Sequence, residues 1–293
     1  MTSHAAATSS PPPAESRFRP KQIIKWSVYT LLLINWGAYI GEDWEIAMHT
    51  LRSGGSLAEW ASAFTTSLDL AAWFGLLFLW ELETYALSDH ADTPFVRWFF
   101  LGIRGVCYLF LAHTVVARAI TVDDLRHLEP MPAVVNLCQL AGQDMSFAYN
   151  LEYTLIDKEN CTSLSAGDRF YQIESTAVTD ASGFRVERLS TWIDLQDAIT
   201  WLLVMATIEI AIWLQDRNIT GGPAMFISRA GKVFYAVLFA HAAYWAYMGH
   251  WLYTWDQLLW IGGFFAIEAN VSEWRKDITR LLGKATPNAN ASA

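Results

Sequence analysis

The chain has 293 residues, of which 53% are hydrophobic, 14% aromatic and only 17% charged. A soluble domain has about 25% charged residues, so this composition argues against an ordinary water-soluble protein and against a disordered chain. The net charge of −9 and the absence of a basic run leave a nucleic-acid partner without electrostatic support. We therefore expect a membrane protein whose main partner is the lipid bilayer.

The first 20 residues contain three consecutive prolines, Pro11, Pro12 and Pro13, among Ala, Ser and Thr. Such a segment has too few apolar groups to fold, so residues 1–20 are predicted to be a disordered cytoplasmic tail. No small-residue cleavage site follows the first apolar run, which argues against a signal peptide.

Six apolar runs are long enough to cross a bilayer as helices. They are 24–41, 67–88, 97–120, 196–215, 230–251 and 255–271. The predicted fold class is therefore all-α: a polytopic membrane protein of six transmembrane helices. The first three helices form the membrane segment 21–120 and the last three form 196–273, which is followed by a cytoplasmic tail over 274–293.

Lys and Arg residues are concentrated at one end of the predicted helices. Thirteen of the 20 lie on the N-terminal side, in the segments 88–104 and 215–232 or at the C-terminal end: Arg17, Arg19, Lys21, Lys25, Arg97, Arg104, Arg217, Arg229, Lys232, Arg275, Lys276, Arg280 and Lys284. By the positive-inside rule, both termini are expected in the cytoplasm. A bacterial inner membrane is the expected location.

The insert 121–195 between the third and fourth helices is predicted to be a small extracytoplasmic cap. It contains Cys138 and Cys161 without a metal-ligand spacing, which favours a disulfide in an oxidising compartment. The segments 170–174 and 184–188 alternate apolar and polar residues around a turn signal at 180–183. This pattern predicts a β-hairpin.

Polar residues recur at a fixed spacing inside the predicted helices. The pattern D-x3-W-x7-E occurs three times, at Asp69, Trp73 and Glu81, at Asp197, Trp201 and Glu209, and at Asp256, Trp260 and Glu268. Arg104 and Lys232 each follow the preceding Glu of the pattern by 23 residues, and His113 and His241 lie nine residues further on. The matches indicate a two-helix hairpin that is repeated three times.

The spacing predicts three polar layers, because a helix rises about 1.5 Å per residue. The Asp residues would lie in an outer layer, the Trp and His residues in a middle layer and the Glu residues in an inner layer. We expect the inner layer to contain the ion pairs Glu81–Arg104, Glu209–Lys232 and Glu268–Lys25, of which the last would join the first and sixth helices. The middle layer is predicted to be a constriction formed by Trp73, Trp201 and Trp260.

Ionisable residues inside a membrane often mark an ion pathway. The predicted function is therefore a cation or proton channel or transporter. The predicted pathway consists of Asp69, Glu81, Asp197, Glu209, Asp256, Glu268, His113 and His241. The same charges would also serve a structural role, by pairing helices and fixing their register. The alternative is thus a non-conducting subunit or scaffold of a larger complex, such as a redox complex.

Sequence motifs of soluble-type enzymes, such as a Walker loop, a GxSxG elbow or HExxH, are absent. An enzyme that acts on a lipid or a quinone is therefore the third choice. His113, His241 and His250 would suit haem as ligands, but a histidine held by Trp or Asp explains the repeat with fewer parts, so no cofactor is expected. The sequence leaves open which species is transported and whether a metal is bound. It also leaves open whether the chain forms a homo-oligomer with the conduction path between its copies.

Overall fold

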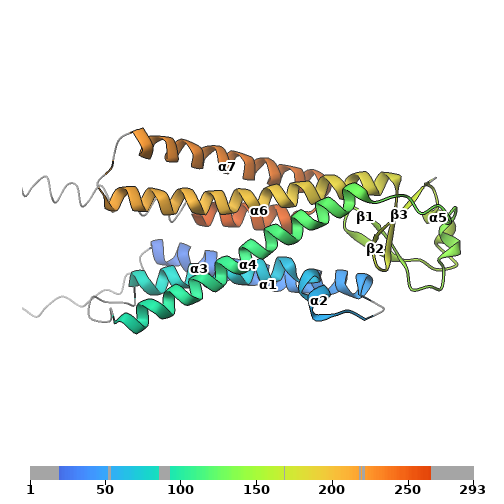
Figure 1. Ribbon diagram of the computed structural model, residues 1–293, viewed down its shortest axis with the longest axis horizontal. Helices are drawn as coiled ribbons and strands as arrows, with labels where there is room; N and C mark the ends of the chain where they lie inside the picture. The colour runs from blue at the N-terminus through green and yellow to red at the C-terminus, as the bar shows by residue number, and fades with distance from the viewer. Residues whose placement is uncertain are drawn as a thin grey trace, which may run out of the picture.

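The computed structural model describes residues 20–51, 54–85, 93–167, 169–217, 219 and 222–264. Long helices form an elongated bundle, and a small sheet covers one end of it (Figure 1). The helices are α1 (Pro20–Thr50), α2 (Leu57–Ala63), α3 (Thr65–Tyr85), α4 (Pro94–His127), η1 (Leu137–Gln139), α5 (Cys161–Leu164), α6 (Ala181–Asp216) and α7 (Gly222–Met248). A further helix over 251–264 follows α7 and is called the last helix below.

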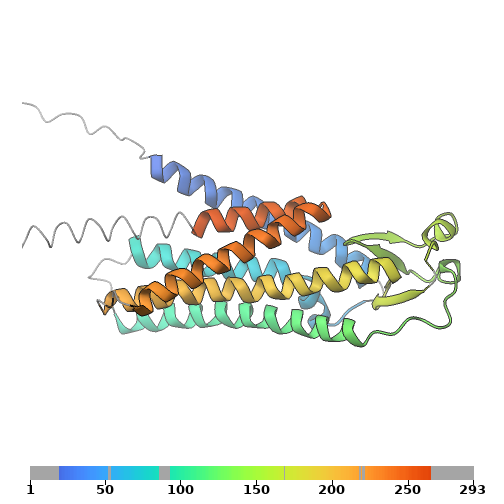
Figure 2. The same ribbon diagram turned by 90° about the horizontal axis from the view of Figure 1, so that it is seen from above.

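The long helices alternate in direction, as Figures 1 and 2 show. Helix α4 packs between α3 and α6, α6 also packs against α7, and α1 contacts α3. The last helix lies against α1, where the rings of Tyr39 and Tyr253 are 5.4 Å apart. Leu111, Val204 and Leu238 are fully buried in the shared core.

The prediction of an all-α fold with six membrane-spanning helices is wrong. Among the described residues, only α4 is long and apolar enough to cross a membrane. Helix α2 and the first part of α3, bent by 73° at a short break, would together count as a second span. The other helices carry polar residues on their inner faces, such as Asn35 in α1, Asp197 in α6 and His241 in α7. These residues lower the hydropathy of the whole helix even where its outer face is apolar.

The insert between α4 and α6 folds into a cap with a mixed four-stranded sheet of order β2-β1-β4-β3. The strands are β1 (Ser146–Tyr149), β2 (Glu152–Leu155), β3 (Phe170–Glu174) and β4 (Ala177–Asp180). Strands β1 and β4 pair in parallel, and the two outer pairs are antiparallel. Phe170 and Leu137 are fully buried in a separate small core of the cap. The predicted Cys138–Cys161 disulfide is present beside this core.

The predicted hairpin is correct in its first strand and wrong in its second. Residues 170–174 form β3, but their partner is β4, and residues 184–188 belong to α6. The backbone N–H groups of Ser182 and Gly183 donate to Asp180 Oδ1, at 3.0 and 2.7 Å. Asp180 therefore caps the N-terminus of α6 by accepting hydrogen bonds from its first N–H groups. The sequence pattern had indicated a turn at this position. A Cβ atom on Gly183 would lie 2.1 Å from Thr179 Oγ1, so this close approach requires glycine.

Hydrogen bonds fasten the cap to two helix ends. Thr176 Oγ1 donates to the carbonyl of His49 at 2.6 Å, and Ser175 Oγ donates to that of Thr50 at 2.8 Å. At the turn between α7 and the last helix, Asn150 Nδ2 donates to the carbonyl of Met248 at 3.0 Å. The cap thus holds the end of α1 and the α7 turn at the same end of the bundle.

Candidate functional site

Three aspartates of the sequence repeat meet in the interior of the bundle, near the cap. Asp69 of α3, Asp197 of α6 and Asp256 of the last helix line one cavity of about 70 Å³. Asp194 of α6 and Arg118 of α4 line the same cavity. Four carboxylates from three helices therefore share a space that is large enough for water, which needs roughly 10–15 Å³.

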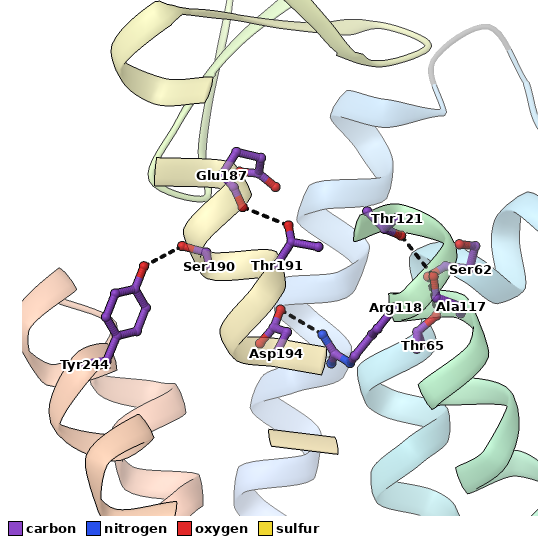
Figure 3. A network of polar contacts seen from close by, with 10 residues as sticks. All are labelled: Ser62, Thr65, Ala117, Arg118, Thr121, Glu187, Ser190, Thr191, Asp194 and Tyr244. Atoms are coloured by element: carbon purple, nitrogen blue, oxygen red, sulfur yellow. Dashed lines mark hydrogen bonds and ion pairs between the residues drawn. The ribbon is translucent and has the colours of Figure 1, made fainter. Parts of the chain in front are cut away.

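Arg118 supplies a positive charge to this group. One of its terminal nitrogens lies 2.7 Å from Asp194 Oδ2, so α4 and α6 are joined by an ion pair (Figure 3). Asp69, with Thr114 and Trp73 as polar neighbours, also lies within the field of Arg118. An adjoining cavity of about 50 Å³ lies among Asp69, Asp194 and Arg118.

Asp197 contacts two polar side chains through one oxygen atom. His241 Nδ1 lies 2.9 Å from its Oδ1 atom, and Gln257 Nε2 donates to the same oxygen at 2.6 Å. The side-chain oxygen of Gln257 accepts a hydrogen bond of 3.4 Å from the indole nitrogen of Trp201. Gln257 therefore connects the acid cluster to the tryptophan layer.

Asp256 has a different environment, because its main charged neighbours are other carboxylates, Asp197 and Asp69. The amide nitrogen of Asn35 in α1 donates to Asp256 Oδ1. The expected contact between the first and last helices of the bundle is therefore made, and Asn35 and Asp256 make it.

The side chains of the cluster do not balance their own charge. Asp69, Asp194, Asp197 and Asp256 carry up to four negative charges, whereas Arg118 and a protonated His241 carry at most two positive ones. Uncompensated charge in a low-dielectric interior is costly, so the surplus carboxylates need bound protons or a cation. We call these six residues the acid cluster.

An aromatic layer closes the cluster on the side away from the cap. The ring of Trp73 lies 6.1 Å from that of Trp201 and 6.0 Å from that of Trp260, and Phe264 packs 5.5 Å from Trp201. Beyond this layer the inner face of α6 continues with Val204 and Met205, which are buried and apolar. The buried side chains that follow Trp201 on the inner face of α6 are therefore apolar, and the next carboxylate along the helix is the half-buried Glu209.

On the side towards the cap, polar residues continue along one face of α6. Figure 3 shows Glu187, Thr191 and Asp194 on successive turns, with Ser190 Oγ 2.9 Å from the hydroxyl of Tyr244 on α7. Burial raises the pKa of Glu187 to about 7, and the charges of Asp194 and Glu174 add to this effect. Glu174 in β3 is exposed at the cap, and partial desolvation together with the charge of Asp124 raises its pKa. A row of acids thus leads from the cap sheet to the acid cluster.

Comparison with protein-family models, with functionally characterised proteins and with solved structures finds no match for this chain. The site is therefore interpreted from its own geometry.

Several residues of the predicted site lie elsewhere. His113 is exposed on the outer face of α4, where Leu111, Thr114 and Arg118 occupy the inner face. Lys232 is exposed, and the ion pairs of the described residues do not include one between it and Glu209. Glu209 instead lies beside the hydroxyl of Tyr108.

The remaining predicted inner pairs cannot be placed in the fold. The side chains of Lys25, Glu81 and Glu268 lie outside the described residues. The pairs Glu81–Arg104 and Glu268–Lys25 therefore stay predictions.

The sequence pattern missed Arg118, Asp194 and Gln257. None of these three residues has an equivalent in the other copies of the repeat, so a search for repeated spacing does not detect them. Arg118 offered one signal, because it is a basic residue inside the apolar run 97–120. Asp194 offered another, because it precedes Asp197 by three residues and so shares its helix face.

The three histidines considered for haem have separate environments. His241 contacts Asp197, the side-chain oxygen of Asn150 lies 3.0 Å from His250 Nε2, and His113 is exposed. Among the described residues, no group of three or more His, Cys, Asp or Glu side chains is arranged to hold a metal ion.

Proposed function

We propose that this protein is a membrane-embedded helical bundle that binds and releases protons at the acid cluster as a step of proton movement. The observation that carries the proposal is the surplus of carboxylates over Arg118 and His241 around a cavity. Protonation neutralises such a surplus at low cost, and each proton can leave again when water reaches the cavity.

Protons fit the cluster better than metal ions do. The carboxylates are already engaged by donors such as Arg118, His241, Gln257 and Asn35. A divalent cation would need several free oxygens that converge on one point, and the described residues offer no such group of acids. The row from Glu174 through Glu187 to Asp194 supports entry from the cap end.

Two observations support a position in a bilayer. Only 22% of the most apolar stretch of α4 is buried, which is unlike the core helix of a soluble protein. Large apolar side chains such as Phe78 and Leu109 are 66% and 71% exposed on the outer surface.

The proposal is tested with the full chain in lipid vesicles that contain a pH-sensitive dye. A potassium diffusion potential drives protons, and the initial rate of internal pH change is measured. We expect Asp197→Asn and Asp256→Asn to reduce the protein-dependent rate at least tenfold. Asp123→Asn is the matched control, because Asp123 is exposed on α4 outside the cluster.

A structural role gives a different result. The Arg118–Asp194 pair joins α4 to α6, and Asp197 joins α6 to α7 through His241. If the protein is a non-conducting subunit or scaffold, wild-type vesicles will show no protein-dependent flux. The cluster variants will then lower only the folded yield or the assembly with a larger complex.

A further inference from the structure

The cavity that contains Asp256 has more aromatic surface than proton binding requires. Its walls are formed by Tyr39, Trp73, Trp201, Trp245, Tyr253, Trp260 and Phe264, together with the carboxylates described above. Aromatic faces beside carboxylates attract ammonium groups, because the negative face of the ring adds to the charge of the acid. The lining therefore combines the two elements of an ammonium site.

One buried polar atom beside Asp256 has no hydrogen-bond partner. Asn35 is 3% exposed, and its amide nitrogen donates to Asp256 while its Oδ1 atom accepts nothing. Trp260 is 6% exposed, and its Nε1–H group is a further polar neighbour of the Asp256 carboxylate. An unpaired buried acceptor next to a carboxylate is satisfied by a ligand that carries both a positive charge and N–H donors.

Arg118 does not fill this role. It pairs with Asp194 and acts on Asp69, whereas the charges that act most on Asp256 are the carboxylates of Asp197 and Asp69. Asp256 is thus the carboxylate of the cluster that most needs a cation.

The size of the cavity limits the ligand. Its volume of about 70 Å³ exceeds the need of a single water molecule. It is less than half of the ~150 Å³ cavity that accommodates benzene in another protein. A cation of one or two heavy atoms fits, with room for one water molecule beside it.

We propose that this cavity binds a small ammonium cation, NH₄⁺ or methylammonium, with Asp256 as its counter-ion and Asn35 Oδ1, which lies beside Asp256, as a further acceptor. The inference rests on the proposed function, because the cation and the proton occupy the same surplus of negative charge. Cation binding therefore displaces up to one proton from the acid cluster.

The test uses the full chain in lipid nanodiscs, titrated with methylammonium chloride at constant ionic strength and followed by calorimetry and tryptophan fluorescence. We expect saturable binding that weakens roughly tenfold or more in Asp256→Asn, because a charge-assisted hydrogen bond is lost. Asn35→Ala should weaken binding to a smaller extent, and Asp123→Asn should leave it unchanged. Near-ultraviolet circular dichroism verifies that each variant is folded.

Other cations define the specificity. Tetramethylammonium, which is too large for the cavity and has no N–H donor, should neither bind nor compete. Binding of tetramethylammonium equal to that of methylammonium, unchanged affinity in folded Asp256→Asn, or no saturable binding at all would overturn the inference.

A proton count separates the inference from the proposed function. Protons released on adding methylammonium support both. Acid–base titration of the cluster without any methylammonium binding leaves the proposed function in place and overturns the inference. Methylammonium binding to a cluster that takes up no protons supports the cation site and removes the proton function.

Discussion

The two halves of α6 bury different chemistry. The half near the cap presents Glu187, Asp194 and Asp197 to the interior, and the half beyond Trp201 presents Val204 and Met205. The polar residues of the interior therefore extend towards the cap, and the aromatic layer bounds them on the opposite side. Under the proposed function, protons reach the acid cluster from the cap end, and passage to the other end requires the tryptophans to move.

The strongest way to break the polar half is to remove its fixed positive charge. Arg118→Leu should destabilise the fold by about 3–5 kcal/mol at neutral pH, because partly buried carboxylates lose their cation. Part of this loss should be recovered at low pH, where the carboxylates become neutral. Thermal unfolding at several pH values measures the effect. Arg118→Lys keeps the charge and is the control; equal stability of the Leu and Lys variants at neutral pH would contradict the account.

The boundary between the two halves is tested at Trp201. Trp201→Ala removes a buried ring that packs on Trp73 and Phe264, so we expect a loss of about 3–5 kcal/mol and a faster proton leak through vesicles. Trp213→Ala on the outer face of the same helix, where the ring is 49% exposed, should change stability by only about 0.5 kcal/mol. An unchanged leak rate in folded Trp201→Ala would show that the layer does not limit proton passage.

Removing the disulfide tests whether the cap and the bundle are stabilised independently. Cys138 and Cys161 close a loop with a sequence separation of 23, so replacing both by Ser should cost the cap about 3 kcal/mol. Hydrogen exchange should quicken in β1 to β4 and stay slow in α6 and α7. If the acid cluster instead lost its proton binding in this variant, the cap and the cluster would not be separable in the way described.

The smallest expected change in stability is at Glu187, which lies in α6 at the cap end of the polar half. Its pKa is raised to about 7 in the folded chain, against an ordinary value of 4.5. Its contribution to stability is therefore fully present below pH ~4.5 and is lost as the pH rises through 7. Glu187→Gln stays neutral, so its stability should exceed that of the wild type by roughly 2 kcal/mol at pH 8, after allowance for partial exposure, and match it at pH 4. Parallel stability profiles over this range would exclude the shift.

The repeated residues were the part of the site that the sequence could predict. The spacing D-x3-W brings Asp69, Asp197 and Asp256 to one cavity because equal spacing places equal side chains at equal depth in adjacent helices. Arg118 and Asp194 have no copies, so no periodicity predicts them, and their partnership depends on how α4 and α6 are rotated.

Other errors arose from local ambiguity. Asp180 followed by Ala, Ser and Gly is compatible with a turn and with a helix start, and in the structure Asp180 accepts the N–H groups of the first helical turn. The number of spans was overestimated because apolar runs were judged by length, whereas polar inner faces lower the hydropathy of most of the long helices.

The most direct test of the surplus negative charge is infrared spectroscopy of the full chain in lipid at neutral pH. The account predicts a C=O stretching band of a protonated carboxyl group that moves on transfer to heavy water, shrinks in Asp256→Asn and persists in Asp123→Asn. A spectrum without such a band, in which every carboxyl of the acid cluster is ionised at neutral pH, would contradict it.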